Sequence, residues 1–352
     1  MVKLHPLTQK LSKHFSLHPS REKTLAVMIL GVLCSSNVHH QSLARYVESP
    51  HPKAALRKVE RFFCEEALAS EDYAKAIVDL LSFKGKFDLC LDRTNWKFGD
   101  KDINYLVLSW RINKKISLPL LFVDLNKAGN SNASERIDLL EVFKGIFGFH
   151  RIKSLMADRE FVGQKWFKML NKTKIPYFIR VKENTKLPWG KSSIQAKRLF
   201  HHLKGWQSRL VEKEMYGSTV YFAGTLSKSG ELVIVMTNQR LKTKQILAKY
   251  RERWSIEELF RKLKTSGFHW ENTHMKHSYR LISLLIILGF ALLIACLMGQ
   301  DDHIPWKKTL NCPLYSIFKQ GLINLQFLLA KSLTGALDLI LTLLERAQYV
   351  LF

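Results

Sequence analysis

The sequence is poor in acidic residues and in cysteine. Its 352 residues include 30 Asp and Glu against 55 Lys and Arg, so the formal net charge is +25. Such a surface repels itself unless a polyanion neutralises it. Nucleic acid is therefore the expected partner, ahead of an anionic membrane surface. The five cysteines show no C-x-x-C spacing, which argues against a disulfide scaffold and favours a reducing compartment.

Long apolar runs are also scarce. The run at residues 24–33 is too short to span a bilayer and predicts a buried helix. Residues 281–298 form an uncharged run of 18 residues, which is a marginal membrane candidate by length alone. A helix that is apolar on every side can also lie in the core of a large protein. We expect a core helix here, and the membrane alternative stays open.

The periodicity of the chain predicts several regions. Residues 1–80 read as short basic helices with a break near 49–52, and we expect them to form a DNA-binding domain unless they are a scaffold with a solvated face. Seven segments from residue 87 follow the order β-β-β-α-β-α-β, with strands expected at 87–92, 104–112, 118–125, 151–157 and 176–184. Three more strand-like runs lie within 206–237, and helices follow from 247, including one at 322–344. The predicted regions are a helical domain at 1–80, an α/β core at 81–184 and 241–300, an all-β insertion at 185–240, and a helical region at 301–352.

Two aspartates are predicted to follow apolar strands. Asp92 comes at the end of FDLCLD, and Asp158 comes directly after SLMA. A single aspartate of this kind is usually a cap or a turn residue. Two carboxylates brought together repel each other unless a cation lies between them. Mg²⁺ prefers such hard oxygen ligands, so the pair indicates a possible metal site.

A third acid lies in the segment KYRERWSIEELFRKLKTSG. If this segment is one continuous helix, Tyr250, Arg253, Glu257, Arg261 and Lys264 share a stripe about 80° wide. Such a stripe could present one metal ligand, Glu257, together with cations for a phosphate backbone. The alternative is a solvated face with intrahelical ion pairs.

The spacing Tyr250-x₂-Arg253-x₃-Glu257-x₆-Lys264 resembles the Tyr-Arg-Glu-Lys signature of the insertion-sequence-four family of DDE transposases. Further segments resemble the two aspartate blocks of that family, the connector between them and the strand that follows: Asp92-Arg93-Thr94, Asp158-Arg159-Glu160-Phe161, Gly129-Asn130-Ser131 with Glu135-Arg136, and FIRVKEN at 178–184.

The resemblance implies a ribonuclease-H-like catalytic core, with a mixed five-stranded sheet, flanking helices and an all-β insertion. It implies two Mg²⁺ ions, with Mn²⁺ as a substitute, held by Asp92, Asp158 and Glu257. The implied activity is cut-and-paste transposition by DNA cleavage and strand transfer, with a hairpin intermediate. The implied DNA contacts are Tyr250, Arg253, Lys264, Arg261, Arg180 and Lys182.

The resemblance also implies double-stranded DNA as the partner, at transposon ends and target, and a homodimer in the DNA complex. It implies a cytoplasmic, nucleoid-associated protein rather than a membrane protein. Relatives stack a flipped base on a tryptophan of the insertion. Residues 226–240 contain no Trp, so this role stays unassigned among Trp189, Trp206 and Trp254, and Trp206 is expected to pack the insertion itself. The rival interpretations are a metal-dependent nuclease, an inactive DNA-binding regulator and a membrane protein.

Overall fold

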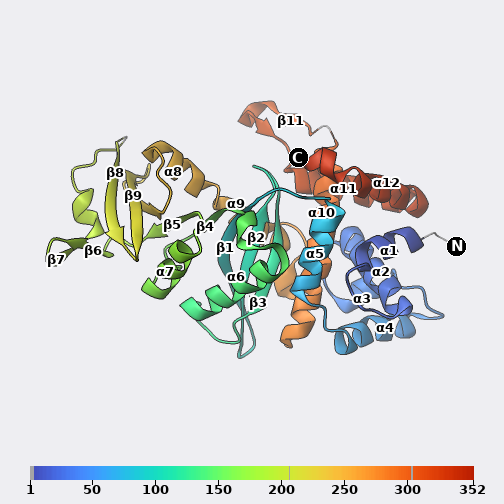
Figure 1. The fold of residues 1–352 in the computed structure, drawn as a ribbon. Helices are drawn as coiled ribbons and strands as arrows, with labels where there is room; N and C mark the ends of the chain where they lie inside the picture. Colours follow the sequence, from blue (N-terminus) through green and yellow to red (C-terminus); the bar gives the residue numbers. More distant parts are fainter. Residues whose placement is uncertain (1–3, 206, 303) are drawn as a thin grey trace.

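A computed structural model describes residues 4–205, 207–302 and 304–352. The molecule is elongated, with helices of the N-terminal and C-terminal regions at one end and the insertion strands at the other (Figure 1). A large sheet lies between the two ends, and the first helix, α1 (His5–Ser12), and the C-terminus both lie at the helical end (Figure 1).

The N-terminal region is helical, as predicted. Its helices are α1 (His5–Ser12), α2 (Pro19–Ser35), α3 (His40–Ala44), α4 (Pro52–Glu65) and α5 (Ser70–Leu80). The apolar run at 24–33 lies inside α2 and is buried throughout, so this run is a core helix. The break expected near 49–52 separates α3 from α4, where His51 caps α4 by accepting a hydrogen bond from the Ala54 N–H.

The main sheet has eight strands in the order β3-β2-β1-β4-β5-β10-β9-β8. The first five strands in the chain appear in the predicted β-β-β-α-β-α-β order, so the mixed α/β class is confirmed. They are β1 (Phe87–Phe98), β2 (Lys101–Arg111), β3 (Ser117–Asp124), β4 (Ile152–Ala157) and β5 (Tyr177–Val181), with α6 (Ala133–Phe147) before β4 and α7 (Gln164–Lys172) after it. β1, β4 and β5 are parallel, whereas β2 and β3 run antiparallel to their neighbours. An Asn132–Glu135 capping box fixes the start of α6.

The strands of the insertion continue this sheet. β10 (Leu232–Thr237) pairs antiparallel with β5, and β9 (Ser218–Leu226) and β8 (Ser208–Met215) follow outward. β6 (Lys186–Trp189) and β7 (Ser192–Gln195) form a separate hairpin. The three strand-like runs predicted within 206–237 are therefore present. They add three strands to the expected five-stranded sheet, which thus has eight strands.

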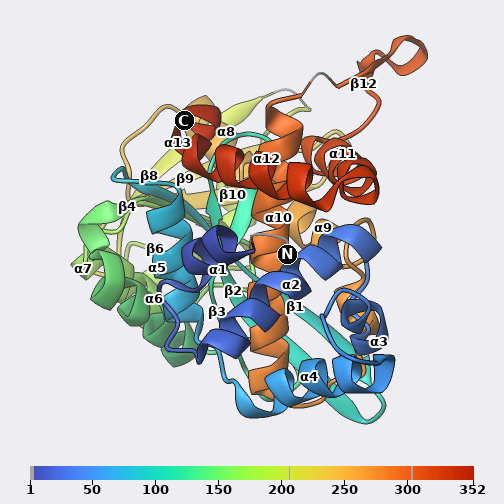
Figure 2. The same cartoon turned by 90° about the vertical axis from the view of Figure 1, so that its right-hand side faces the viewer.

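Helix α10 (Ser278–Gln300) runs through the helical end of the molecule, beside α2 and beneath α11 (Ile317–Lys331) and α12 (Leu333–Glu345) (Figure 2). It is the one helix of the described chain that is long and apolar enough to cross a membrane, and 94% of its most apolar window is buried. Its position is that of a core helix. The helix expected at 322–344 is instead two helices, because Ser332 ends α11 and caps α12 through the Gly335 N–H. A short α13 (Ala347–Leu351) follows.

Candidate active site

The parallel pairing of β1 and β4 brings the two predicted aspartates together. The last paired residues are Leu91 on β1 and Ala157 on β4, and Asp92 and Asp158 directly follow them in the sequence. Neighbouring strands lie about 4.8 Å apart, which places the two residues side by side. The prediction that β1 ends at Asp92 is wrong, because residues beyond Asp92 keep pairing with β2 after β4 has ended.

Asp92 is a strongly perturbed acid. Its side chain is 18% exposed, and burial raises its pKa to about 6. The negative charges of Glu160 and Asp158 also act to raise the pKa, while the Arg93 N–H, 2.8 Å from Oδ1, and the Arg253 guanidinium act to lower it. The site therefore concentrates negative charge in a partly dry environment.

The segment that carries the signature is two helices rather than one. α8 (Thr243–Arg251) ends before Arg253, and α9 (Trp254–Leu263) begins after it. The Arg253 N–H bonds to the Tyr250 carbonyl, which is the tighter i→i−3 pattern of a turn. Lys264 follows the last residue of α9. The predicted stripe on one continuous helix is therefore wrong.

Two signature residues nevertheless contact the aspartates, and one of them, Arg253, also contacts a third signature residue, Glu257. The Tyr250 hydroxyl donates to Asp158 Oδ1 at 3.1 Å. Arg253 Nη1 lies 3.5 Å from Asp92 Oδ2, and its Nη2 lies 2.5 Å from Glu257 Oε1. Burial raises the pKa of Tyr250 to about 12, so this hydroxyl stays protonated and donates near neutral pH.

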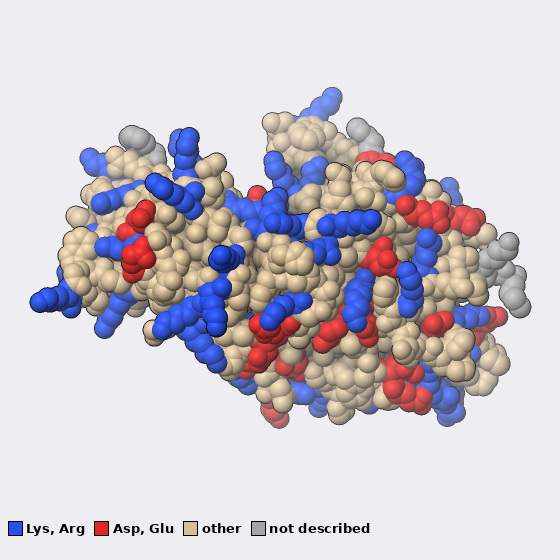
Figure 3. Space-filling model, in the orientation of Figure 1, with Lys and Arg blue, Asp and Glu red and all other residues tan. Residues whose placement is uncertain are grey.

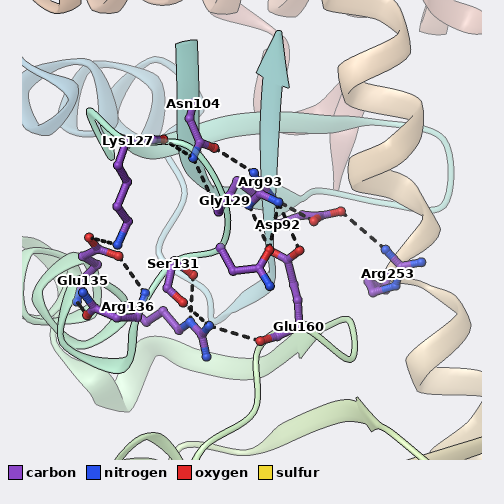
Figure 4. Close-up of polar contacts among 12 residues, drawn as sticks. Asp92, Arg93, Asn104, Lys127, Gly129, Ser131, Glu135, Arg136, Glu160 and Arg253 are labelled. Atoms are coloured by element: carbon purple, nitrogen blue, oxygen red, sulfur yellow. Dashed lines mark hydrogen bonds and ion pairs between the residues drawn. The ribbon is translucent and has the colours of Figure 1, made fainter. Parts of the chain in front are cut away.

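Arg253 is the central cation of the site. Its side chain is 11% exposed and lies between Asp92 and Glu257 (its contact with Asp92 is seen in Figure 4). Burial lowers the pKa of Arg253, but its interactions with Tyr250, Glu257 and Asp158 outweigh burial and hold the pKa above its ordinary value. Its Nε atom is buried and has no hydrogen-bond partner among the described residues.

Arg93 ties the acid-bearing strand to its surroundings (Figure 4). It donates to Asn104 Oδ1 at 3.0 Å and to Asn130 Oδ1 at 3.1 Å. Its Nε lies 3.3 Å from Glu160 Oε1, across the loop that follows Asp158. Sequence reasoning gave Arg93 and Glu160 no such role, although both lie in the aspartate blocks.

Arg136 holds the same loop from the other side (Figure 4). This arginine is almost fully buried and donates to Ser131 Oγ at 2.8 Å. It also donates to the carbonyls of Val162 and Glu160, each at 3.1 Å. Residues 131 and 136 belong to the connector noted in the sequence, so the connector clamps the loop that follows Asp158.

A second acid on β1 has a different environment. Asp88 accepts hydrogen bonds of 2.6 Å from both Ser154 and Lys249. Burial raises the pKa of Asp88, but these two hydrogen bonds outweigh it, so the pKa lies below its ordinary value. Lys249 also pairs with Glu252 at 2.7 Å. Asp88 is thus fully compensated, in contrast to Asp92.

The other predicted DNA contacts lie outside the acid cluster. Lys264 pairs with Glu271 at 2.5 Å and lies 5.2 Å from the centre of the Trp96 ring. Arg261 pairs with Glu258, and Arg180 pairs with Glu231. Lys182 is exposed just beyond β5.

The tryptophans weighed for base stacking also lie elsewhere. The Trp189 side chain is 51% exposed, and Lys213 Nζ lies 4.6 Å from its ring centre. Trp254 is 58% exposed at the start of α9. Trp206 lies outside the described residues.

The donor set suits a divalent cation. Asp92, Asp158 and Glu257 offer carboxylate oxygens, which are the ligands Mg²⁺ prefers. In the described chain, no three acidic, histidine or cysteine side chains are yet close enough to hold a metal ion together. The Arg253 guanidinium lies between two of these acids, 3.5 Å from Asp92 and 2.5 Å from Glu257. Arg253 thus supplies a cation to Asp92 and Glu257.

A mixed sheet with partly buried carboxylates just beyond the paired residues of two adjacent parallel strands is a framework suited to an α/β enzyme. A family model described as "Transposase DDE domain" matches residues 89–294, which is more than half of the chain, and the chain belongs to this family. The cryo-EM structure of the piggyBac transposase synaptic complex with hairpin DNA is similar over 93% of this chain and 77% of that chain, with 10% identity and a TM-score of 0.46. No curated protein matches the chain.

Proposed function

We propose that this protein is an insertion-sequence-four transposase that cuts the ends of its own mobile element and joins the excised DNA to a target. One observation carries the proposal. Three of the four signature residues take part in contacts among the proposed acids: Tyr250 bonds to Asp158, and Arg253 bridges Asp92 and Glu257. A solvated helix face with only intrahelical pairs would not make these long-range contacts.

The proposed catalytic core is ribonuclease-H-like. The order β3-β2-β1-β4-β5, with β2 antiparallel between its neighbours and β1, β4 and β5 parallel, supports this assignment. Asp92 and Asp158 then lie at the carboxyl end of the parallel pair, where α/β folds commonly place their sites.

Asp92, Asp158 and Glu257 are the proposed ligands of Mg²⁺, with Mn²⁺ as a substitute. When bound, the metal would polarise the scissile phosphate and lower the pKa of an attacking water. The site fits this cation because burial and neighbouring charges leave Asp92 with a pKa of about 6. A divalent cation would compensate the negative charge of the acids, two of which now pair with Arg253.

The other side chains position these acids. Tyr250 fixes the orientation of the Asp158 carboxylate through its hydroxyl. Arg93 and Arg136 hold the loop after Asp158, so the second acid is set on a rigid backbone. Arg253 neutralises the acids in the absence of metal, and it becomes available to a phosphate group if the acids bind a metal instead.

The proposed partner is double-stranded DNA, at the element ends and at the target, and the proposed working state is a homodimer because an element has two ends. Lys264, Arg261, Arg180 and Lys182 are proposed contacts to the DNA backbone, beside Tyr250 and Arg253. The large excess of basic residues supports this partner. A cytoplasmic, nucleoid-associated location and a hairpin route for second-strand cleavage belong to the same proposal.

A donor-plasmid assay tests the proposal. The plasmid carries the gene for this protein with its flanking DNA, and purified protein is added with Mg²⁺ or with EDTA. We expect Mg²⁺-dependent release of the flanked segment by the wild type. Asp92→Asn, Asp158→Asn and Glu257→Gln should each abolish release while retaining DNA binding, and Asp88→Asn is the matched acid control.

The assay also separates the rivals. Covalently closed ends on a denaturing gel indicate the hairpin route. Cutting without joining to a target plasmid would replace the proposal with a metal-dependent nuclease. Binding without cutting by the wild type would replace it with an inactive regulator.

A further inference from the structure

A basic pocket lies beside the helix that begins at Trp254, next to the turn that carries Arg253. It has a volume of about 620 Å³ and lies among α8, α9, the turn between β2 and β3, and the segment around the short hairpin of β11 (Trp306–Lys307) and β12 (Cys312–Pro313). Its charged lining residues are Arg111, Lys114, Lys115, Arg251, Glu252, Glu258 and Lys262. Blue side chains gather where α9 lies below the β11 hairpin (Figure 3).

The lining carries an uncompensated positive charge. Its five cations and two acids sum to 5 − 2 = +3. Both acids already have partners: Glu252 pairs with Arg111 and Lys249, and Glu258 pairs with Arg261. The remaining lining cations, Lys114, Lys115, Arg251 and Lys262, have no carboxylate within 4.0 Å in the part of the chain that the structure describes.

Lys262 is the cation most in need of a partner. It is only 5% exposed, yet its Nζ donates to a single described acceptor, the Lys115 carbonyl, at 3.3 Å. An ammonium group has three donors, and a buried charge is unfavourable unless it is paired. A lysine buried at a pocket wall without a counter-ion is the arrangement expected when the counter-ion is an anionic ligand.

Aromatic side chains complete the pocket. Trp254 is 58% exposed and Tyr315 is 38% exposed, and both line it. Large exposed aromatic rings beside cations are typical of surfaces that bind single-stranded nucleic acid, because unpaired bases stack on the rings while cations hold the phosphates.

The pocket adjoins the acid cluster. Ser255, which lines the pocket, has its Oγ 3.6 Å from Cys90 Sγ. Cys90 lies two residues before Asp92 on the same face of β1, about 7 Å along the strand. A strand held in the pocket therefore runs within reach of the proposed acids.

We propose that this pocket, built around Lys262 and Trp254, binds an unpaired segment of a DNA strand through its phosphates. This inference rests on the proposed function for the identity of the ligand as DNA. It adds a strand-binding site that is separate from the signature residues.

The test is fluorescence anisotropy with a labelled twelve-residue oligothymidylate, in EDTA so that no cutting occurs. Lys262→Met should weaken binding about tenfold, and it should reduce the salt slope by about 0.7 for each phosphate that the variant no longer neutralises. Lys262→Arg should retain binding, and Trp254→Ala should weaken it. The matched control is Lys172→Met, an exposed lysine on α7.

Wild-type affinity and salt slope in Lys262→Met would overturn the inference. The inference would also be overturned if Lys262→Met bound a duplex of the same length more weakly but bound the single strand as tightly as the wild type does. The thermal midpoint of each variant shows whether the variant still folds. If plasmid cutting depends on the three acids but Lys262→Met binds the oligonucleotide normally, this inference is refuted and the proposed function stands. Lys262-dependent binding without any cutting refutes the proposed function alone.

Discussion

Replacement of Arg253 by methionine tests how the acid cluster is held together. The guanidinium contacts Asp92 at 3.5 Å and Glu257 at 2.5 Å, and its side chain is 11% exposed. Removal of one partner from a buried ion pair costs about 3–5 kcal/mol. The lower end applies here, because the Glu257 side chain is 35% exposed and is screened by water, and because Asp92, with a pKa of about 6, can take up a proton to relieve part of the loss.

The expected loss of about 3 kcal/mol corresponds to a fall of roughly 6 °C in the thermal midpoint, at about 2 °C for each kcal/mol in a chain of this size. Mg²⁺ should recover most of it, since a ligand at 100 times its Kd stabilises by about 2.7 kcal/mol. The assay is a thermal melt with and without Mg²⁺ at pH 7.5. We expect the Mg²⁺-dependent rise to be larger in Arg253→Met than in the wild type.

Arg261→Met is the matched control. Arg261 is exposed and pairs with Glu258 within the same helix, so its removal should cost about 0.5 kcal/mol or less and leave the Mg²⁺ response unchanged. If Arg253→Met melts within about 1 °C of the wild type, well under the shift expected for a chain of this size, and responds equally to Mg²⁺, Arg253 is not the cation that holds these acids.

Three further predictions concern the surroundings of the site and the core. Asp88→Asn should lower the free energy of unfolding by about 1–3 kcal/mol at pH 7 and retain plasmid cutting. Because the folded-state pKa of Asp88 is lowered, the difference from wild type in urea denaturation should be constant above the ordinary carboxyl pKa and shrink as the pH falls below it; a difference that grows on acidification would contradict this assignment. Arg136→Met should leave buried carbonyls unpaired and speed amide hydrogen exchange at 159–162, whereas unchanged exchange would remove its clamping role. Gly321→Ala should destabilise the packing of α10 on α11, because a Cβ would lie 1.8 Å from the Ala295 carbonyl oxygen. The control, Gly145→Ala on α6, has no described atom within 4 Å of the added Cβ and should be neutral or stabilising. Equal thermal midpoints for the two variants would contradict that packing.

Much of the fold could be predicted from the sequence because its signals are local. The alternating runs located β2–β5 within a few residues and placed three more strands within 206–237. The run at 281–298 could not be assigned from hydropathy, since a core helix and a membrane helix share it. In the structure the run is buried against the surrounding helices and β3, which is the position of a core helix.

The errors came from non-local effects. β1 runs past Asp92 because β2 continues to pair with it, and a single sequence does not show where a partner strand ends. The insertion joins the main sheet because β10 finds the free edge of β5. The helix around Arg253 breaks where its side chain turns toward two acids, a tertiary contact that helical periodicity cannot reveal.

The same distinction applies to the site. The signature residues and both aspartates could be named from motif spacing, and the structure places Asp92 and Asp158 side by side and brings Tyr250 and Arg253 against the acids. The roles of Arg93 and Arg136 depend on where the loop after Asp158 folds back. Motif spacing carries no such information.

The central claim is that Asp92, Asp158 and Glu257 form one metal-dependent site for cutting DNA. The most direct measurement is release of the flanked segment from the donor plasmid by wild type and Glu257→Gln, each with Mg²⁺ and with EDTA. The account predicts release by the wild type with Mg²⁺ alone, and none by the variant, whose DNA binding is retained. Release by Glu257→Gln at the wild-type rate, or by the wild type in EDTA, would contradict it.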